Sequence, residues 1–350
     1  MGILIAIFVL AFLIFFHELG HFLIAKLLKV KVEVFSIGFG KKIVCKKYGE
    51  TDYCLSLIPF GGYVQMKGQD DTNPTLKNSD KDSYNSKTPF QRILILLGGP
   101  LFNIMLAFFI YLGIALTGWQ KLKPVIGEIL PNSSAEHKLK KGDIILKIDN
   151  HQIKIWDDIH KYTHNKKILR ITIKRDGKIL NLTIKPKIIE VKNIFGEKEK
   201  KFLIGIQPAN SFITIKYNLI DSFKIAINHT IETSKIIFQG LWKLISGVLG
   251  LNMISGPITI VKTTSDISNY GITPLLLFTA LISINLGILN LLPIPALDGG
   301  HILFNSYEMI FKKEVNETIM YNLTIGGWIL LFGIMSIGFY NDISRIISGF

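Results

Sequence analysis

The chain has 350 residues, of which 49% are hydrophobic and only 19% are charged. Together with a positive mean hydropathy, this composition excludes an ordinary soluble enzyme and indicates a membrane protein with a substantial soluble part. The net charge of +14 is spread over short loops and a polar insert that carry no nucleic-acid-binding motif, so we expect no nucleic-acid partner.

The first predicted element is an apolar helix over residues 3–25, which is long enough to cross a bilayer. It contains the run His17-Glu18-Leu19-Gly20-His21, and ionisable groups at membrane depth cost about 3 kcal/mol each, which makes them functional candidates. At this spacing His17 and His21 share one helix face and could bind one metal ion, while Glu18 could take a proton from an attacking water. The alternative is two histidines that only pack against neighbouring helices. No Lys or Arg precedes the run, so we expect an anchor rather than a cleaved signal peptide.

The stretch after this helix predicts β-structure. Residues 26–60 alternate polar and apolar side chains between glycines, which favours short strands and hairpins, and the polar stretch 67–88 predicts a mobile loop. Cys45 and Cys54 could face each other across a hairpin or be ordinary small apolar residues. We expect them to be reduced and structural.

Three more apolar segments, 93–117, 274–293 and 322–340, bring the predicted number of spans to about four. The stretch 26–50 contains seven lysines and two glutamates, so the positive-inside rule places it in the cytoplasm and the N-terminus outside. A loop over 298–321 then returns to the cytoplasmic side. A fifth span near 236–254 is disfavoured by its polar residues and glycines.

The insert between the second and third spans predicts a small, mostly β domain. Strand patterns cover 125–129 and 144–149, a short helix is expected over 133–139, and 168–184 has the pattern of a hairpin. Residues 217–250 then carry apolar side chains at helical spacing, which predicts an amphipathic helix at the membrane surface. The predicted domains are 1–120 (first two spans), 121–208 (the insert), 209–273 (an interfacial linker) and 274–350 (last two spans).

The third span ends in Asn-Leu-Leu-Pro-Ile-Pro-Ala-Leu-Asp-Gly-Gly-His at residues 290–301. Pro293 and Pro295 prevent a regular helix and free backbone groups, which neighbours or a bound chain must satisfy. A catalytic zinc site needs three protein ligands and an open position. Asp298 is the predicted third ligand, because the topology brings it to the depth of the two histidines, although an Asp before Gly is also common in turns. The rival ligand His301 is expected outside the membrane in a supporting role.

These motifs, in this order and with a PDZ-like insert between them, resemble the site-2 protease family, and more narrowly its bacterial members that act in regulated intramembrane proteolysis. The resemblance covers nearly the whole chain. It implies a polytopic α-helical membrane protein with about four transmembrane helices, a membrane-associated β-hairpin region and one inserted PDZ-like, mostly-β domain. The better-studied relatives carry two tandem PDZ domains, whereas this insert has room for one.

The resemblance also implies residue roles. Zinc (Zn²⁺) would be bound by His17, His21 and Asp298, and Glu18 would be the general base. The residues implied in holding an extended substrate are Asn285, Asn290, Pro293 and Pro295, together with Gly61 and Gly62 of the hairpin region, which would add the substrate as a strand.

The predicted function is that of a zinc-dependent intramembrane endopeptidase of the bacterial cytoplasmic (inner) membrane. It would cleave transmembrane segments of single-span membrane proteins, such as trimmed anti-sigma factors or remnant signal peptides, with its active site toward the cytoplasm. The PDZ-like domain would lie outside and bind peptide C-termini, and the lipid bilayer would surround the spans. One alternative is a membrane-anchored HExxH protease that acts on soluble proteins, which usually keeps its motif outside the apolar run. The other is a membrane scaffold that binds peptide tails through its PDZ-like domain and has a structural metal. A structural metal site needs no base, so the presence of Glu18 argues against this alternative.

Overall fold

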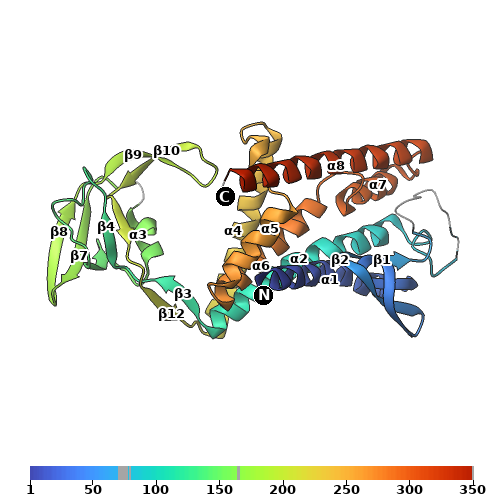
Figure 1. Cartoon of the computed structure of the whole chain (residues 1–350), viewed down its shortest axis with the longest axis horizontal. Helices are drawn as coiled ribbons and strands as arrows, with labels where there is room; N and C mark the ends of the chain where they lie inside the picture. Colours follow the sequence, from blue (N-terminus) through green and yellow to red (C-terminus); the bar gives the residue numbers. More distant parts are fainter. Residues whose placement is uncertain (70–77, 79, 164–165, 349–350) are drawn as a thin grey trace. The chain divides into compact units, whose positions relative to one another are not determined.

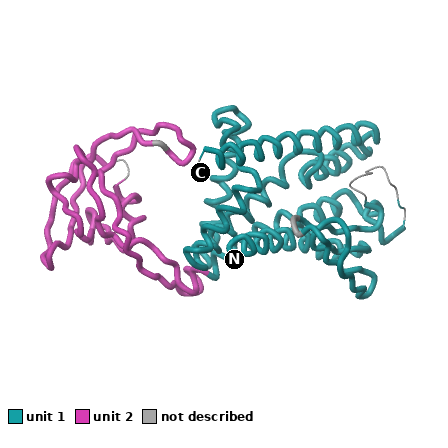
Figure 2. The backbone as a smooth tube through the Cα atoms, viewed as in Figure 1, with its two compact units in different colours: residues 1–113, 223–350 teal, residues 114–222 magenta. Residues whose placement is uncertain are grey.

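The computed structural model describes residues 1–69, 78, 80–163 and 166–348. The chain forms two compact units (Figure 2), one built from residues 1–113 and 223–350 and the other from residues 114–222. The first unit contains most of the helices and the motifs singled out above, and the second consists mainly of short strands.

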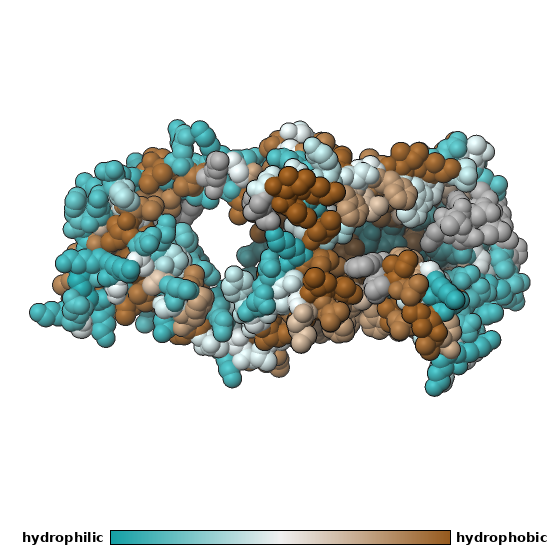
Figure 3. Space-filling view, in the orientation of Figure 1, coloured by the Kyte–Doolittle hydropathy of each residue, from teal (hydrophilic) through white to brown (hydrophobic). Residues whose placement is uncertain are grey.

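Among the described residues, four helices are long and apolar enough to cross a membrane, which confirms the four predicted spans. They are α1 (Gly2–Leu27), α2 (Pro89–Thr117), α6 (Ile272–Asn290) and α8 (Glu317–Ile347), and Figure 1 shows them in the first unit. Hydrophobic side chains cover much of the surface of these helices (Figure 3). A surface of this kind is stable against lipid rather than water, so the chain is an integral membrane protein.

Three further helices join these spans. The predicted amphipathic segment forms α4 (Leu219–Ile245), which is not among the candidate spans. Helix α5 (Pro257–Ser268), which packs against α1, was not predicted. The prediction of a loop over 298–321 is wrong, because residues Asp298–Phe311 form helix α7. The preceding prolines interrupt the third span but leave Asp298 free to begin a new helix, which ends at Lys312 in a left-handed conformation.

The region between α1 and α2 is a bent hairpin of two long strands, β1 (Val32–Tyr48) and β2 (Thr51–Met66), rather than several short ones. Because both strands bend, residues 34–37 have partners on both sides, 62–65 on one and 52–55 on the other. Strand β2 packs against α1 (Figure 1). The segment 62–66 therefore lies at the edge of the sheet next to the helix that carries the HExxH motif.

The two cysteines lie opposite each other in this hairpin. Cys45 pairs in register with Cys54, and the two form a disulfide, so the expectation that they are reduced is wrong. Composition indicated a hairpin but could not set its register, and only the register brings the two sulfur atoms together.

The described part of the predicted mobile loop 67–88 is bound to the base of the hairpin. The backbone N–H of Tyr84 donates to the carbonyl of Lys67 at 2.8 Å. The Lys67 ammonium is 2.8 Å from a carboxylate oxygen of Asp80 and 2.8 Å from one of Asp82. Residues 70–77 and 79 of the predicted loop lie outside the described residues.

The second unit is organised around a four-stranded sheet of order β6-β5-β7-β8, beside three strand pairs. Buried isoleucines of the sheet, among them Ile145, Ile148, Ile171 and Ile173, form one hydrophobic core cluster with Trp156. The predicted strands and hairpin are present, but 133–139 forms turns instead of the expected helix. The elements are β3 (Trp119–Leu122), β4 (Ile126–Ile129), β5 (Ile144–Ile148), β6 (His151–Gln152), α3 (Trp156–Thr163), β7 (Leu169–Arg175), β8 (Lys178–Ile184), β9 (Lys187–Lys192), β10 (Lys198–Leu203), β11 (Ile206–Pro208) and β12 (Phe212–Ile215).

Candidate metal centre

One face of α1 carries two histidines whose rings converge. The Nε2 atoms of His17 and His21 are 3.2 Å apart, as the spacing of one helical turn predicts. Both residues are buried, with 8% and 7% of their surfaces exposed. Two imidazole nitrogens that point at one place within an apolar helix are a ready pair of metal ligands.

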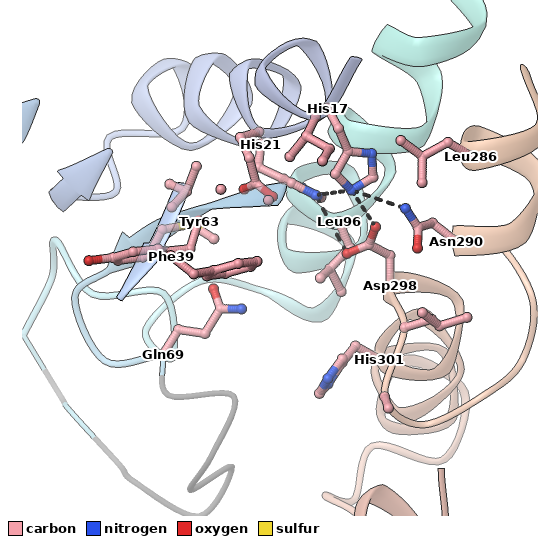
Figure 4. A pocket seen from close by; sticks show the side chains of 18 of the residues that line it. His17, His21, Phe39, Tyr63, Gln69, Leu96, Leu286, Asn290, Asp298 and His301 are labelled. Atoms are coloured by element: carbon pink, nitrogen blue, oxygen red, sulfur yellow. Dashed lines mark hydrogen bonds and ion pairs between the residues drawn. The ribbon is translucent and has the colours of Figure 1, made fainter. Parts of the chain in front are cut away.

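Asp298 completes a cluster of three with these histidines (Figure 4). One carboxylate oxygen is 3.2 Å from His17 Nε2 and the other is 3.5 Å from His21 Nε2. The three ligand atoms lie within 4.8 Å of one another. A set of two imidazoles and one carboxylate suits Zn²⁺ and leaves the fourth tetrahedral position free for water or substrate, so these residues fit a catalytic zinc ion.

The glycines after Asp298 explain how a side chain some 280 positions from the histidines is aimed at them. A Cβ atom on Gly299 would collide with the carbonyl oxygens of Leu291 and Leu292, and one on Gly300 with the backbone of Ile294 and Pro295. The proline-broken loop 291–297 therefore folds back against the first turn of α7. This contact requires two residues without side chains directly after the aspartate.

Helix α2 packs against both histidines of the site. A Cβ atom on Gly99 would lie 2.7 Å from His17 Cε1 and 2.8 Å from His17 Nε2. The Nδ1 atom of His21 is 2.9 Å from the carbonyl oxygen of Ile95, and His17 Nδ1 is 3.2 Å from Nδ2 of Asn103. The sequence analysis missed Asn103, although a fully buried polar side chain inside an apolar span is itself a signal of function.

A cavity of about 540 Å³ opens onto the three ligands. On the side of the hairpin it is lined by Gly61, Gly62, Tyr63 and Val64, which belong to the sheet edge of β2. Glu18 lines the same cavity, and a Cβ atom on Gly62 would lie 3.2 Å from its Cγ. The base candidate, the metal ligands and an open sheet edge thus face one space.

The predicted substrate-holding residues divide into two groups. Gly61, Gly62 and Asn290 line the cavity, and Asn290 Nδ2 is 3.4 Å from His17 Nε2. Asn285, Pro293 and Pro295 are not among the described residues that line it. The rival ligand His301 lines the cavity but lies outside the three-residue cluster, where Figure 4 shows it apart from the histidines of α1.

Ion pairs connect the segments around the site. Arg92 of α2 is 2.6 Å from a carboxylate oxygen of Glu308, which ties α2 to the helix that begins at Asp298. Near the hairpin base, hydrogen bonds to Asp80 and Asp82 raise the pKa of Lys67 above its ordinary value. The hydrogen bond from Lys67 in turn lowers the pKa of Asp82. These ion pairs join the segments that flank the cavity.

Comparisons with known proteins show the family to which the chain belongs. The sequence profile of peptidase family M50 matches residues 5–334. A Campylobacter jejuni protein described as a zinc metalloprotease is 48% identical over 345 residues, covering 98% of this chain and 94% of its own length. A Helicobacter pylori protein of the same description is 40% identical and covers 98% and 99%. The zinc metalloprotease RasP of Geobacillus kaustophilus is 31% identical and covers 95% of both.

Among solved structures, the PDZ domain of an SdrC-like protein from Listeria monocytogenes matches 25% of this chain and 86% of its own, with 24% identity and a TM-score of 0.20. At that score the likeness carries no argument about the second unit. The match of the M50 profile to nearly the whole chain, the full-length relatives and the HExxH motif agree with one another. The chain belongs to peptidase family M50, the metalloendopeptidases of the site-2 protease type.

Proposed function

We propose that the protein is a zinc-dependent intramembrane endopeptidase that cleaves transmembrane segments of single-span membrane proteins. The observation that carries the proposal is the cluster of His17, His21 and Asp298, which lines a cavity together with residues of the candidate membrane spans. Zinc is the metal we assign, since the donor set suits it and the relatives are described as zinc metalloproteases.

The roles of the residues follow from the chemistry of peptide hydrolysis. When bound, zinc would polarise the scissile carbonyl and lower the pKa of water at the open position. Glu18 lines the same cavity and is the nearest candidate base on α1, one residue after His17. We assign it to accept the proton of the attacking water and to pass that proton to the leaving amine.

The open edge of the hairpin is the proposed binding site for the substrate. Residues 62–65 pair with 34–37 on one side, and Gly62, Tyr63 and Val64 also line the cavity. A peptide bond within a helix is shielded by its own hydrogen bonds, so a transmembrane substrate must be unwound before it can be cut. Adding the unwound segment to this edge as a strand would satisfy its backbone. We assign Asn290, at the end of α6, to hold the strand beside the ligands, with Asn285, Pro293 and Pro295 supporting this end of the span.

The proposed orientation places the hairpin and the metal centre toward the cytoplasm and the second unit outside. Its basis is the lysine-rich stretch 26–50. Disulfides persist in oxidising compartments, so the pair Cys45–Cys54 opposes this orientation, and its redox state in cells tests it. In the proposed orientation the cytoplasm would keep both thiols reduced, and they would react only with a membrane-permeant reagent. An intact Cys45–Cys54 disulfide in cells, or labelling by an impermeant reagent after reduction, would contradict the orientation.

We assign the insert, residues 121–208 within the second unit, as a single PDZ-like module that binds peptide C-termini of substrates. Its mostly-β content and one well-formed helix, α3, support this assignment. Segment 209–273, including α4 with Phe223, Phe238 and Trp242 exposed, would lie at the membrane surface.

Glu18→Gln tests the proposed function. The variant should bind zinc and remain folded but fail to cleave a co-expressed single-span reporter, because an amide cannot accept the proton. The matched control is Glu33→Gln, which changes a carboxylate in β1 and should leave cleavage intact. Cleavage that continues in Glu18→Gln would disprove the mechanism. A wild-type protein that binds zinc but cleaves no membrane reporter would favour the scaffold alternative.

A further inference from the structure

Helix α2 presents a hydrogen-bonding group to the outer nitrogen of each histidine. The Nδ1 of His21 is 2.9 Å from the carbonyl oxygen of Ile95, and the Nδ1 of His17 is 3.2 Å from Nδ2 of Asn103. The Nε2 atoms of both rings point the other way, toward each other and toward Asp298. The two rings are therefore held from behind by residues of a different helix.

A metal ligand must offer a lone pair, so a neutral imidazole that binds through Nε2 carries its proton on Nδ1. For His21 this condition is met, because a carbonyl oxygen can only accept, and Ile95 therefore selects the tautomer with the proton on Nδ1. His17 needs the same tautomer. Its partner behind the ring must then also be an acceptor.

The Asn103 amide has one atom that can do this, its Oδ1. The side chain is fully buried, and Oδ1 has no hydrogen-bond partner within the part of the chain that the structure describes. The oxygen and nitrogen of an amide have nearly the same shape, so a half-turn exchanges them without moving anything else. The half-turn leaves one buried amide atom unpaired in either orientation, so the number of hydrogen bonds does not decide between them. The role of His17 as a ligand decides between them, because it requires a hydrogen-bond acceptor next to Nδ1.

We propose that Asn103 is a positioning residue that accepts the Nδ1–H of His17 through its Oδ1 and so keeps His17 Nε2 directed at the metal. The inference rests on the proposed zinc site and names a residue that acts through a ligand. The backbone carbonyl oxygen of Asn103 separately accepts a hydrogen bond from Ser283 Oγ at 2.7 Å, which does not involve the Asn103 side chain. A Cβ atom on Gly287 would lie 3.5 Å from Asn103 Cβ, so α6 packs closely on the same turn of α2.

Two substitutions separate an acceptor role from simple packing. Asn103→Asp keeps an acceptor oxygen at nearly the same size, and Asn103→Leu keeps the volume but removes the acceptor. The control Ser283→Ala removes the neighbouring hydrogen bond to the Asn103 backbone and leaves the side chain in place. Zinc affinity of the purified full-length protein is measured by competition with a chelator, and thermal unfolding in excess chelator reports whether each variant folds.

We expect Asn103→Leu to weaken zinc binding by about 10–100-fold, the usual effect of removing a partner behind a metal-binding histidine. Asn103→Asp and Ser283→Ala should stay close to wild type. With Co²⁺ as the probe, the visible absorption should change in Asn103→Leu and not in Asn103→Asp.

Wild-type zinc affinity in Asn103→Leu would overturn the inference, and so would an equal loss in a folded Asn103→Asp. These results would leave the proposed function standing. A wild-type protein that binds no zinc would overturn both.

Discussion

Gly20 of α1 and Gly98 of α2 lie in direct backbone contact. A Cβ atom on Gly98 would be 2.6 Å from the carbonyl oxygen of Gly20. The contact falls one residue before His21 on one helix and one residue before Gly99 on the other. Because the helices touch here without side chains between them, α2 comes close enough to pack directly behind the two histidines.

The first prediction concerns Gly99→Ala. The added methyl group would lie 2.7 Å from His17 Cε1 and within contact distance of both ligand rings, so the rings or the helix must move. We expect a loss of about 1–3 kcal/mol in unfolding free energy together with weaker zinc binding, measured by thermal unfolding and by chelator competition. Gly113→Ala on the same helix is the control, because its Cβ atom would meet nothing within 4 Å. Equal behaviour of the two variants would contradict the close packing.

The second prediction compares two adjacent glycines of α8. A Cβ atom on Gly327 would lie 2.9 Å from the backbone nitrogen of Ala296, in the loop that leads to Asp298, whereas one on Gly326 would meet nothing within 4 Å. Gly327→Ala should displace the loop and lower reporter cleavage. Gly326→Ala should keep activity and stabilise the helix by up to about 1 kcal/mol. A loss of activity in Gly326→Ala alone would refute this assignment.

The third prediction concerns the metal. Removing zinc with a chelator should lower the unfolding temperature of the wild-type protein, since zinc at 100 times its Kd contributes about 2.7 kcal/mol to the folded state. In Asp298→Ala the chelator should have little further effect and the zinc content should fall. Asp266→Ala, which changes an exposed carboxylate of α5, is the control. Unchanged zinc content in Asp298→Ala would remove it from the ligand set.

The fourth prediction concerns the hairpin. The disulfide closes a loop with a sequence separation of 9, which by chain entropy corresponds to about 2–3 kcal/mol. Cys45 is exposed and Cys54 is buried, so Cys45→Ser removes the bond and leaves the packed side of the sheet intact. We expect faster tryptic cleavage between Lys41 and Lys47 in Cys45→Ser and in reduced wild-type protein. Equal cleavage rates before and after reduction would show that the bond does not hold the hairpin.

The fifth prediction concerns pH in the second unit. The hydrogen bond from Lys166, and then the one from the Arg170 backbone, lower the pKa of Asp149 below 3.8. A carboxyl group whose pKa is lower in the folded than in the unfolded state stabilises the fold above about pH 4, and this contribution is lost as pH falls through the folded pKa.

Asp149→Asn should therefore increase amide exchange in strand β5 relative to wild type at pH 7, and the difference should shrink in acid. Glu190→Gln changes an exposed partner of Lys198 and should have a smaller effect. A difference between Asp149→Asn and wild type that stays constant down to pH 2 would contradict the ionic origin.

The sequence by itself determined the family and the four spans, and it predicted the three residues that form the candidate metal cluster. Charged and imidazole groups are so costly inside an apolar run that their presence at residues 17–21 already indicates a site. Membrane-spanning segments can also be predicted from the sequence, because their length and composition are set by the bilayer and not by neighbouring segments. The strands of the second unit could be predicted because the alternation of apolar and polar residues lies within each segment.

Only the tertiary structure decided which groups hold the ligands in place. Ile95 is 74 residues from His21, and Asn103 is 86 residues from His17. Neither lies in the motifs at residues 17–21 and 290–301, and Ile95 makes its contact through a backbone carbonyl, which every residue possesses. Helix α7 and the Cys45–Cys54 pair depended in the same way on how distant segments pack and on strand register. Whether a residue type can bind zinc depends only on its own side chain and can be read from the sequence. The direction in which that side chain points depends on contacts between distant segments, which only the tertiary structure shows.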